Sequence, residues 1–242
     1  MEKITPIVFY HAACSWPDTR YKRPAGQWQD IIKEQVQQWN QSGLTDIAEI
    51  NVGINGTNEE YKEACSIFPI KSNCWYNGYD VAWEFPTINK MIKIIQNFTD
   101  DTSICYHHTK AVSWNTNPYH VAWRKAMQWY CIENWKVCIK ALDQVETCGI
   151  FWYDKKNYPF HFSGNFFWAR AGYLKTLSEL IDNGDRMLAE TWITSNNSTP
   201  SVIDFNPGTR TNETYAKRDF NNTTKFIRGQ YPVTIGKFFT EK

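Results

Sequence analysis

Short apolar runs alternate with helix-period segments over the first part of the chain. The runs have the length and composition of buried strands. The segments between them repeat apolar residues at helical spacing, and Pro86 suits the first turn of a helix. This order is typical of right-handed βαβ units around a mainly parallel sheet. The predicted strands are 7–10, 47–54, 73–76 and 103–106, and the predicted helices are 28–40, 58–64 and one that starts at Pro86.

The second half of the chain has a different pattern. One long helix is expected from about 119 to 142, followed by strands at 148–153 and 160–169 and a helix at 174–181. The close spacing of the later strands indicates that this part of the sheet is mixed. Because no internal repeat or linker is evident, we expect a single α/β domain. The last ~45 residues, rich in Asn, Thr and Gly, are expected to wrap the surface or cover the site.

Composition and charge exclude several classes of function. The 242 residues carry a formal net charge of +1 with no run of like charges, so no nucleic-acid partner and no polybasic membrane tether are expected. The first residues lack the apolar stretch of a signal peptide, so none is expected, and no apolar stretch approaches the ~18 residues of a spanning helix. We therefore expect a soluble, cytoplasmic protein. Seven scattered cysteines without a Cys-x-x-Cys pair argue against a disulfide scaffold or a zinc site.

The segment His161-Phe-Ser-Gly-Asn-Phe-Phe-Trp-Ala-Arg170 is the most unusual stretch of the sequence. Aromatic residues that favour strands surround a Ser163-Gly164-Asn165 centre. Glycine inside a strand marks a bulge or a place where a ligand approaches the backbone. The His, Ser and Asn side chains beside it would supply hydrogen bonds to a polyhydroxylated ligand. A bulged core strand with internally satisfied polar groups explains the segment equally well.

His107-His108-Thr109-Lys110 directly follows a predicted strand. Ligands of open α/β sheets bind beyond the carboxyl ends of the strands, and Lys can pair with a phosphate while His and Thr add donors. Two adjacent His residues on a strand point to opposite faces, so they are not expected to hold one metal ion. A solvated loop is the alternative interpretation.

Gly184-Asp-Arg-Met-Leu-Ala-Glu-Thr-Trp192 holds two carboxylates beside apolar residues. Asp185 or Glu190 could act as a general base, although acidic residues at a helix start often serve only the helix dipole. The motifs GxGxxG, Walker loop, HExxH and GxSxG are missing from the sequence. So is Asp-x-Asp, the pair that holds a divalent ion in many nucleotide-sugar enzymes.

Seven segments, taken in chain order, together resemble a known family. They are Val8-Phe-Tyr-His11, Ser42-Gly-Leu44, Glu84-Phe-Pro-Thr87, Tyr106-His-His-Thr-Lys-Ala-Val-Ser113, Trp123-Arg124, His161-Phe-Ser-Gly-Asn-Phe-Phe-Trp168 and Ala189-Glu-Thr-Trp192. In this order they are similar to small GT-A-fold glycosyltransferases and glycosyltransferase-like proteins of bacteria and large DNA viruses, including chlorella viruses. The likeness covers about residues 7 to 195.

The resemblance implies a fold and a function. The fold is a GT-A-like, Rossmann-like single domain over 1–242, with a mixed, mostly parallel sheet flanked by helices. The nucleotide-binding half would span about 1–115, the acceptor and catalytic half 116–195, and the C-terminal wrap 196–242. The protein would move a sugar from a nucleotide-sugar donor to a glycan or other hydroxyl acceptor, with inversion.

The same resemblance assigns roles to individual residues. Glu190 would be the base that deprotonates the acceptor hydroxyl, and Asp185 is a second candidate carboxylate. His108 and Lys110 stand where Asp-x-Asp usually lies, and Lys110 would neutralise the diphosphate, so a Mn or Mg cofactor is left open and no metal ligand is assigned. Donor-binding residues would be Tyr10, His11, Ala12, His108, Thr109, Lys110 and Arg124. Residues facing the sugar or acceptor would be His161, Ser163, Gly164, Asn165 and Trp192.

Two other functions are alternatives for this sequence. A carbohydrate-binding protein of the same fold without turnover would also lack Asp-x-Asp. A nucleotidyltransferase would be expected to need carboxylate-bound magnesium, and the sequence offers no evident pair of ligands for it. The oligomeric state, the donor and the acceptor stay open at this level.

Overall fold

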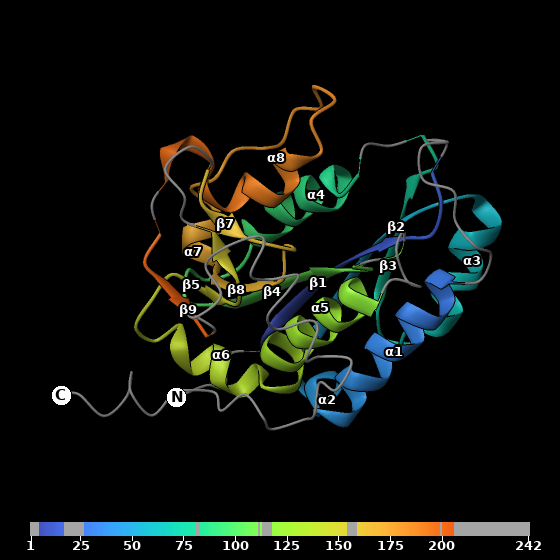
Figure 1. The fold of residues 1–242 in the computed structure, drawn as a ribbon, viewed down its shortest axis with the longest axis horizontal. Helices are drawn as coiled ribbons and strands as arrows, with labels where there is room; N and C mark the ends of the chain where they lie inside the picture. The colour runs from blue at the N-terminus through green and yellow to red at the C-terminus, as the bar shows by residue number, and fades with distance from the viewer. Residues whose placement is uncertain are drawn as a thin grey trace.

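The computed structural model describes residues 5–16, 27–80, 83–110, 112, 118–153, 159–198 and 200–205. Seven strands form the central sheet in the order β3-β2-β1-β4-β8-β5-β9 (Figure 1). Every neighbouring pair is parallel except the two that involve β8, which runs antiparallel to β4 and to β5. The strands are β1 (Ile7–Ala13), β2 (Glu49–Asn55), β3 (Asn73–Gly78), β4 (Ser103–His108), β5 (Thr147–Gly149), β8 (Phe167–Arg170) and β9 (Val202–Asp204).

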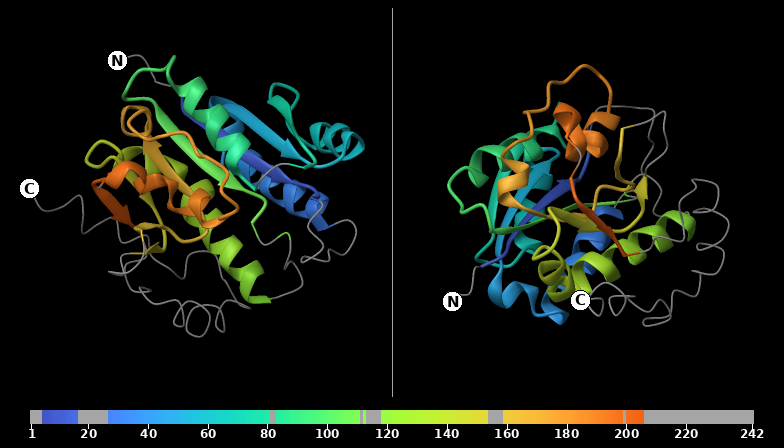
Figure 2. Two further views of the ribbon diagram at one scale, coloured as in Figure 1. Left: turned by 90° about the horizontal axis from the view of Figure 1, so that it is seen from above. Right: turned by 90° about the vertical axis from the view of Figure 1, so that its left-hand side faces the viewer.

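Helices cover both faces of this sheet (Figure 2). One apolar cluster, the α1-side core, lies between the sheet and α1 (Gln27–Gln41), α3 (Asn58–Ile67), α5 (Pro118–Gln128) and α6 (Trp135–Ala141). The other, the α4-side core, lies under α4 (Phe85–Ile95), α7 (Ala171–Leu174) and α8 (Met187–Thr191). The predicted α/β class, with a mixed and mostly parallel sheet flanked by helices, is confirmed.

Strand β1 shows how the sequence produces two cores. Successive side chains of a strand point to opposite faces. Val8 and Tyr10 therefore enter the α1-side core, whereas Ile7 and Phe9 enter the α4-side core. All four side chains are buried. A strand buried on both faces is mostly apolar, which is why residues 7–10 form a continuous apolar run and not an alternation.

The single helix predicted from 119 to 142 is wrong, because the segment is divided in the structure. Helix α5 passes into a π-helical turn (Trp129–Glu133), and α6 starts after Asn134. Asn134 has non-helical backbone angles (φ −102°, ψ 30°), and both its amide N–H and its side-chain Nδ2 donate to the Trp129 carbonyl, at 3.2 and 2.7 Å. A side chain that hydrogen-bonds the backbone in this way competes with the helical ladder.

The strand predicted at 148–153 is also divided. β5 ends at Gly149, Phe151 adopts a left-handed backbone (φ 64°), and β6 (Trp152–Tyr153) pairs with β7 (His161–Phe162) in a separate two-stranded sheet. The Asp204 carboxylate accepts the amides of Phe151 and Trp152, at 3.1 Å each. These two bonds satisfy the backbone where the main sheet stops. The strand predicted at 160–169 likewise becomes β7, a turn and β8.

The helix predicted at 174–181 ends almost where it was expected to start, because α7 covers only Ala171–Leu174. The Asn89 side chain of α4 holds Leu180, near the end of the predicted helix, outside helical pairing. Its Oδ1 accepts the Leu180 amide at 2.7 Å, and its Nδ2 donates to the Leu180 carbonyl at 2.9 Å. Both backbone groups are thereby withdrawn from helical pairing. The short helix α2 (Leu44–Ile47) was not predicted, and it takes the first residue of the strand expected at 47–54.

Residues 202–204 form the edge strand β9, which was not predicted either, and 3-10 turns over Trp192–Asn197 precede it. The rest of the expected C-terminal wrap, residues 206–242, lies outside the described residues. In the part of the chain that the structure describes, no helix has the length and apolarity needed to cross a bilayer.

His107 of β4 points into the α1-side core. Its ring is fully buried among Tyr10, Trp39 and Phe166, with ring centroids 4.8, 5.4 and 5.1 Å away. The Trp39 indole donates to its Nε2 at 3.2 Å. Burial, assisted by the neighbouring His108, holds the pKa of His107 well below its ordinary value. Protonation at Nε2 would also remove the acceptor of the Trp39 bond.

His107 should therefore make the protein less stable in acid. Its pKa is lower in the folded than in the unfolded chain, so below about pH 6.5 the unfolded chain binds more protons and the free energy of unfolding falls as pH falls. We expect His107→Gln to reduce this slope between pH 6.5 and 5 by up to about 1.4 kcal/mol per pH unit. Urea unfolding of both proteins from pH 8 to 5 measures it. If the free energy of unfolding of the wild type and of His107→Gln has the same pH slope below pH 6 as well as above pH 7, the lowered pKa of His107 is contradicted.

Candidate active site

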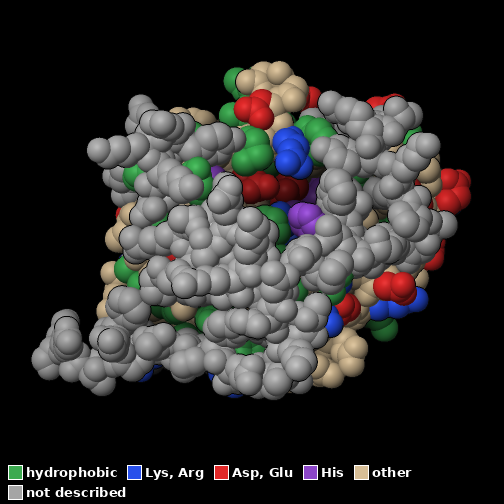
Figure 3. Space-filling view, in the orientation of Figure 1, with side chains coloured by type: hydrophobic (Ala, Val, Ile, Leu, Met, Phe, Trp, Pro, Cys, Tyr) green, Lys and Arg blue, Asp and Glu red, His purple; other side chains and the backbone are tan. Residues whose placement is uncertain are grey.

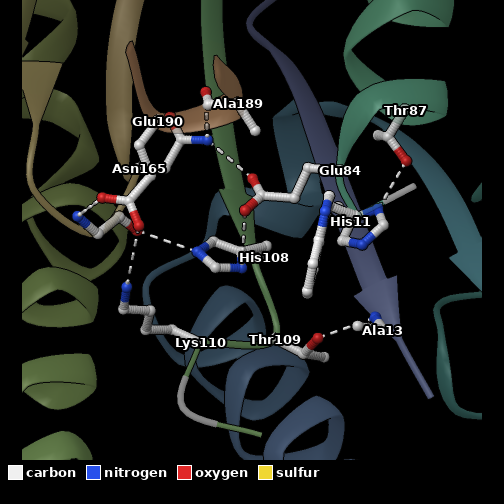
Figure 4. A network of polar contacts seen from close by, with 12 residues as sticks. His11, Ala13, Glu84, Thr87, His108, Thr109, Lys110, Asn165, Ala189 and Glu190 are labelled. Atoms are coloured by element: carbon white, nitrogen blue, oxygen red, sulfur yellow. Dashed lines mark hydrogen bonds and ion pairs between the residues drawn. The ribbon is translucent and has the colours of Figure 1, made fainter. Parts of the chain in front are cut away.

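Polar side chains meet at the carboxyl ends of β1 and β4, on the side of the sheet that α4 covers (Figure 4). His11 and His108 are neighbours in the parallel register of these two strands. Tyr106 pairs with Phe167 of the antiparallel strand β8, so the residues that precede β8 lie beside those that follow Tyr106. The turn at 163–165 is thus brought to the segment 108–110. Figure 3 shows acidic, basic and histidine side chains together in a hollow where Figure 1 places α4 and α8.

Glu190 of α8 points into this site. Its Oε2 accepts the Gly164 amide at 3.3 Å and lies 4.0 Å from His161 Nε2, while its Oε1 lies 4.0 Å from Lys110 Nζ. Burial alone would raise the pKa of this carboxyl. Lys110, His161, the Gly164 N–H and His108 together outweigh burial and lower it. Glu190 is therefore ionised at neutral pH.

Lys110 is the cation that faces Glu190. Its ammonium lies 4.1 Å from the centre of the Trp123 ring, an arrangement that is stabilising for a cation over an aromatic face. Its backbone carbonyl accepts a hydrogen bond from Arg124 Nη1 at 3.3 Å, and the same guanidinium pairs with Glu34 through Nε and Nη2, both at 3.2 Å. The Lys110 side chain retains 12% exposure and that of Glu190 20%, so both can be reached by a ligand.

His108 and Glu84 form a second group of contacts. His108 Nε2 lies 3.0 Å from the Gly164 carbonyl, and Nδ1 lies 3.6 Å from Glu84 Oε1. Glu84 Oε2 accepts hydrogen bonds from the Tyr106 hydroxyl and from Asn165 Nδ2, both at 2.7 Å. Burial lowers the pKa of His108, with a further contribution from Lys110, although Glu84, the Gly164 carbonyl and Glu190 oppose it.

The turn Ser163-Gly164-Asn165 joins these two groups. Gly164 (φ 98°) and Asn165 (φ 58°) both have left-handed backbones, which Gly and Asn tolerate best. The backbone N–H of Asn165 donates to the Phe162 carbonyl at 2.9 Å, and the backbone N–H of Ser163 donates to the Phe151 carbonyl at 2.9 Å. These backbone N–H groups of the turn therefore have partners within the protein. The turn interrupts a core strand and its backbone N–H groups are satisfied by the protein, with the Gly164 N–H donating to Glu190; contact with a ligand stays a prediction.

The structure brings together Glu190, Lys110, His108, His161, Gly164 and Asn165 from the sequence-predicted site. His11 lies near them, with Nδ1 2.8 Å from Thr87 Oγ1. Thr109 is buried, and its hydroxyl accepts the Ala13 amide at 2.8 Å, so it joins β4 to β1. Arg124 supports the Lys110 backbone, as described above. Ser163 is half-buried within the turn.

Four predicted residues lie elsewhere. Tyr10 and Ala12 are fully buried in the α1-side core, on the face opposite His11, and the Tyr10 hydroxyl donates to Gln35. Trp192 is buried in the α4-side core with its indole donating to the Ser178 carbonyl at 2.8 Å. Asp185 is exposed and accepts the Met187 amide at 2.9 Å. None of these four has a side-chain contact with Glu190 or Lys110 among those found in the described residues.

Glu84 and Trp123 are site residues that sequence reasoning did not assign, although both stand in segments that carry the family likeness. Glu84 precedes α4 with no strand or charge pattern to single it out. Its contacts on β4 and on the 163–165 turn are 22 and 81 residues away in sequence. No periodicity argument connects positions so far apart.

The chain also matches a family model over residues 9–225, described as a domain of unknown function, DUF8361. It belongs to that family. No curated protein matches it. Neither the family description nor the structures below mention a virus, so the viral part of the resemblance stays a prediction.

Solved structures resemble the chain in fold. A 4-diphosphocytidyl-2C-methyl-D-erythritol synthase is 12% identical, with a TM-score of 0.46 over 84% of this chain and 89% of that one. A structure from Desulfovibrio desulfuricans G20, provisionally described as a nucleotide-diphospho-sugar transferase, is 8% identical, with a TM-score of 0.47 over 84% and 80%. A second synthase, from Anaerococcus prevotii DSM 20548, is 10% identical, with a TM-score of 0.41 over 83% and 87%. Likenesses this distant carry no functional argument.

Replacing Gly164 by Ala should damage the site and the fold together. A Cβ at this position would lie 2.6 Å from Met127 Sδ and 3.2 Å from Trp123 Cζ2, on a backbone with positive φ. Strain and overpacking together are expected to lower the free energy of unfolding by about 2–5 kcal/mol. Gly184→Ala is the matched control, because Gly184 also has positive φ (84°) but nothing lies within 4 Å of its Cβ position. Urea unfolding should show a cost of about 1–2 kcal/mol there, and equal costs at both positions would contradict the packing argument.

Proposed function

We propose that this protein is a glycosyltransferase that moves a sugar from a nucleotide-sugar donor to a hydroxyl acceptor, with inversion. The observation that supports it most directly is the Glu190–Lys110 pair. An ionised carboxylate and an ammonium lie 4.0 Å apart at the carboxyl edge of the parallel strands, and both are partly exposed. Ligands of open α/β sheets bind at this edge. The pair supplies the two charges that glycosyl transfer needs, a proton acceptor and a partner for a leaving anion.

In the proposed reaction Glu190 removes the proton of the acceptor hydroxyl. The acceptor oxygen forms its bond to the anomeric carbon as the bond between that carbon and the diphosphate oxygen breaks. The electron pair of the broken bond leaves with the nucleoside diphosphate, and the proton ends on Glu190. Lys110 pairs with the negative charge that develops on the leaving phosphate. Attack from the face opposite the leaving group inverts the anomeric centre.

The residues at 108–110 do not fit a bound divalent cation. Such ions take carboxylate and carbonyl oxygens, whereas this segment presents an imidazole, a hydroxyl bonded to the Ala13 amide and an ammonium beside Glu190. Across the described ranges, no group of three or more His, Cys, Asp or Glu side chains is arranged to hold a metal. We therefore assign the charge on the diphosphate to Lys110.

Glu190→Gln is expected to lower transfer by about 10²–10⁴-fold and to leave donor binding intact, because the amide cannot accept the proton. The wild type is first screened with UDP-, GDP- and dTDP-sugars by thermal shift, and the stabilising donor is used to measure nucleoside diphosphate release with glycan acceptors. Asp185→Asn, which neutralises an exposed carboxylate five residues away, is the control and should keep full activity. Retained transfer in Glu190→Gln would remove Glu190 as the base.

Lys110→Ala is expected to weaken nucleoside diphosphate binding about 10–100-fold, the loss of one charge-assisted contact. Calorimetry in the presence of EDTA measures this without any contribution from a metal. Lys93→Ala is the control, since Lys93 is an exposed cation that pairs with Glu179 at 3.6 Å on the surface. Equal affinities in both variants would contradict the role of Lys110. Binding of free glycans with indifference to every nucleotide would favour a carbohydrate-binding protein instead.

A further inference from the structure

Glu84 contacts three residues on two segments of the site yet lies outside the Glu190–Lys110 pair. It stands directly before α4, and its backbone carbonyl accepts the amides of Thr87 and Ile88, which fixes it to the first turn of that helix. Its carboxylate reaches Tyr106 and His108 on β4 and Asn165 in the turn before β8. We infer that Glu84 is the positioning residue that holds Glu190 in its working orientation. This inference rests on the proposed function for its effect on transfer.

The first path from Glu84 to Glu190 runs through the Asn165 amide. Asn165 Nδ2 carries two hydrogens. One is donated to Glu84 Oε2 at 2.7 Å and the other to the Ala189 carbonyl at 3.1 Å (Figure 4). Ala189 is the residue before Glu190, so this nitrogen ties the backbone of α8 to the start of α4. The carboxylate at 84 determines which way the amide faces, because only the NH₂ group can satisfy both acceptors.

The second path runs through His108. The Gly164 carbonyl accepts from His108 Nε2 at 3.0 Å, and the Gly164 amide donates to Glu190 Oε2 at 3.3 Å. Because Nε2 donates, a neutral His108 presents the lone pair of Nδ1 to Glu84 Oε1, 3.6 Å away, and a cationic His108 presents an N–H. Glu84 thus favours the charged ring and limits its rotation. The first path therefore holds the backbone next to Glu190, and the second ends on the Glu190 carboxylate itself.

Glu84 itself is poorly placed to react. Its Oε2 already accepts two hydrogen bonds of 2.7 Å, and its Oε1 faces the His108 ring. Its side chain is 13% exposed, against 20% for Glu190. Glu84 is held by two short hydrogen bonds on one oxygen and is less exposed than Glu190, whose single hydrogen bond is longer, so we assign Glu84 to orienting its neighbours and Glu190 to accepting the proton.

The test uses Glu84→Gln with Glu49→Gln as a matched control. Glu49 also accepts side-chain amides, from Asn51 at 2.9 Å and Asn73 at 3.4 Å, but it lies at the start of β2, far from the carboxyl edge. With the donor found above, Glu84→Gln should lower kcat about 10–100-fold and change the donor KM less than twofold. Glu84→Gln removes the charge but keeps an oxygen that can accept from Asn165, so the path through Asn165 is tested with Glu84→Ala. The Glu84→Ala/Asn165→Gly double variant should be no slower than the slower of its two single variants, within about twofold, because both changes break that path.

A readout that needs no turnover separates this inference from the proposed function. The groups that face His108 are Glu84, Lys110, Glu190 and the Gly164 carbonyl, and Glu84 raises the pKa of His108 against the effect of burial. An NMR titration of the imidazole should therefore show a lower His108 pKa in Glu84→Gln and an unchanged one in Glu49→Gln. If no donor is turned over by the wild type but the His108 pKa falls as expected, the proposed function fails and the contact stands.

Two results would overturn the role of Glu84. One is a His108 pKa that is the same in Glu84→Gln as in the wild type. The other is an active wild type whose kcat, per folded protein, does not change in Glu84→Gln. If Glu84→Gln does not fold, Asn165→Gly takes its place, because glycine accepts the left-handed backbone of residue 165 and removes only the amide. A normal kcat in Asn165→Gly would then refute the inference.

Discussion

The antiparallel pairing of β8 with β4 is the constraint on which the site depends. Parallel strands bring their carboxyl ends to one edge, but they cannot bring the start of a later strand there. Because β8 runs the opposite way beside β4, the residues that enter β8 meet the residues that leave β4. Gly164 and His108 are 56 positions apart in sequence and share a hydrogen bond for this reason. One reversed strand in an otherwise mostly parallel sheet therefore gathers both halves of the chain at one point.

The adjacent residues His107 and His108 show how the sheet separates structure from chemistry. Their side chains point to opposite faces, and both have lowered pKa values because both are buried. His107 lies among aromatic rings, with an indole as its donor. His108 lies between a carbonyl and a carboxylate, close to two further charges. The two residues are of the same type and adjacent in sequence. Because successive side chains of a strand point to opposite faces, only one of them reaches the site.

Most of the fold could be predicted from the chain because its signals are local. The apolar runs of β1 and β4 and the apolar face of α4 follow from periodicity, and the break at 163–165 follows from a glycine among aromatic residues. The errors share a different cause. The Asn134 side chain interrupts the long helix, and Asp204 binds the backbone where the strand predicted at 148–153 divides. Asn89 binds Leu180, near the end of the helix predicted at 174–181. Single polar side chains take over backbone groups there, and Asn89 and Asp204 do so from distant positions, which no local pattern records.

The candidate site was predictable to the same extent. Lys110, His108 and Glu190 stand in short segments whose residue types suggested chemistry, and topology brings them together. Tyr10 and Trp192 look similar in sequence to residues that line a pocket, but their large rings fill the two cores. Glu84 could not be predicted because its partners are close to it only in the folded chain. Aromatic residues are therefore weak site markers in a protein this rich in them.

Strand β9 ties the end of the described chain to the site's surroundings. It covers the outer edge of β5, and Phe205 donates its amide to the Gly149 carbonyl at 2.9 Å. Asp204 in turn holds the backbone from which the β6–β7 ribbon starts, and His161, which faces Glu190, is part of that ribbon. Shortened versions of this protein must therefore keep residues 200–205. Without them β5 would become an open edge, prone to pair with other chains, and the ribbon that presents His161 would lose its support.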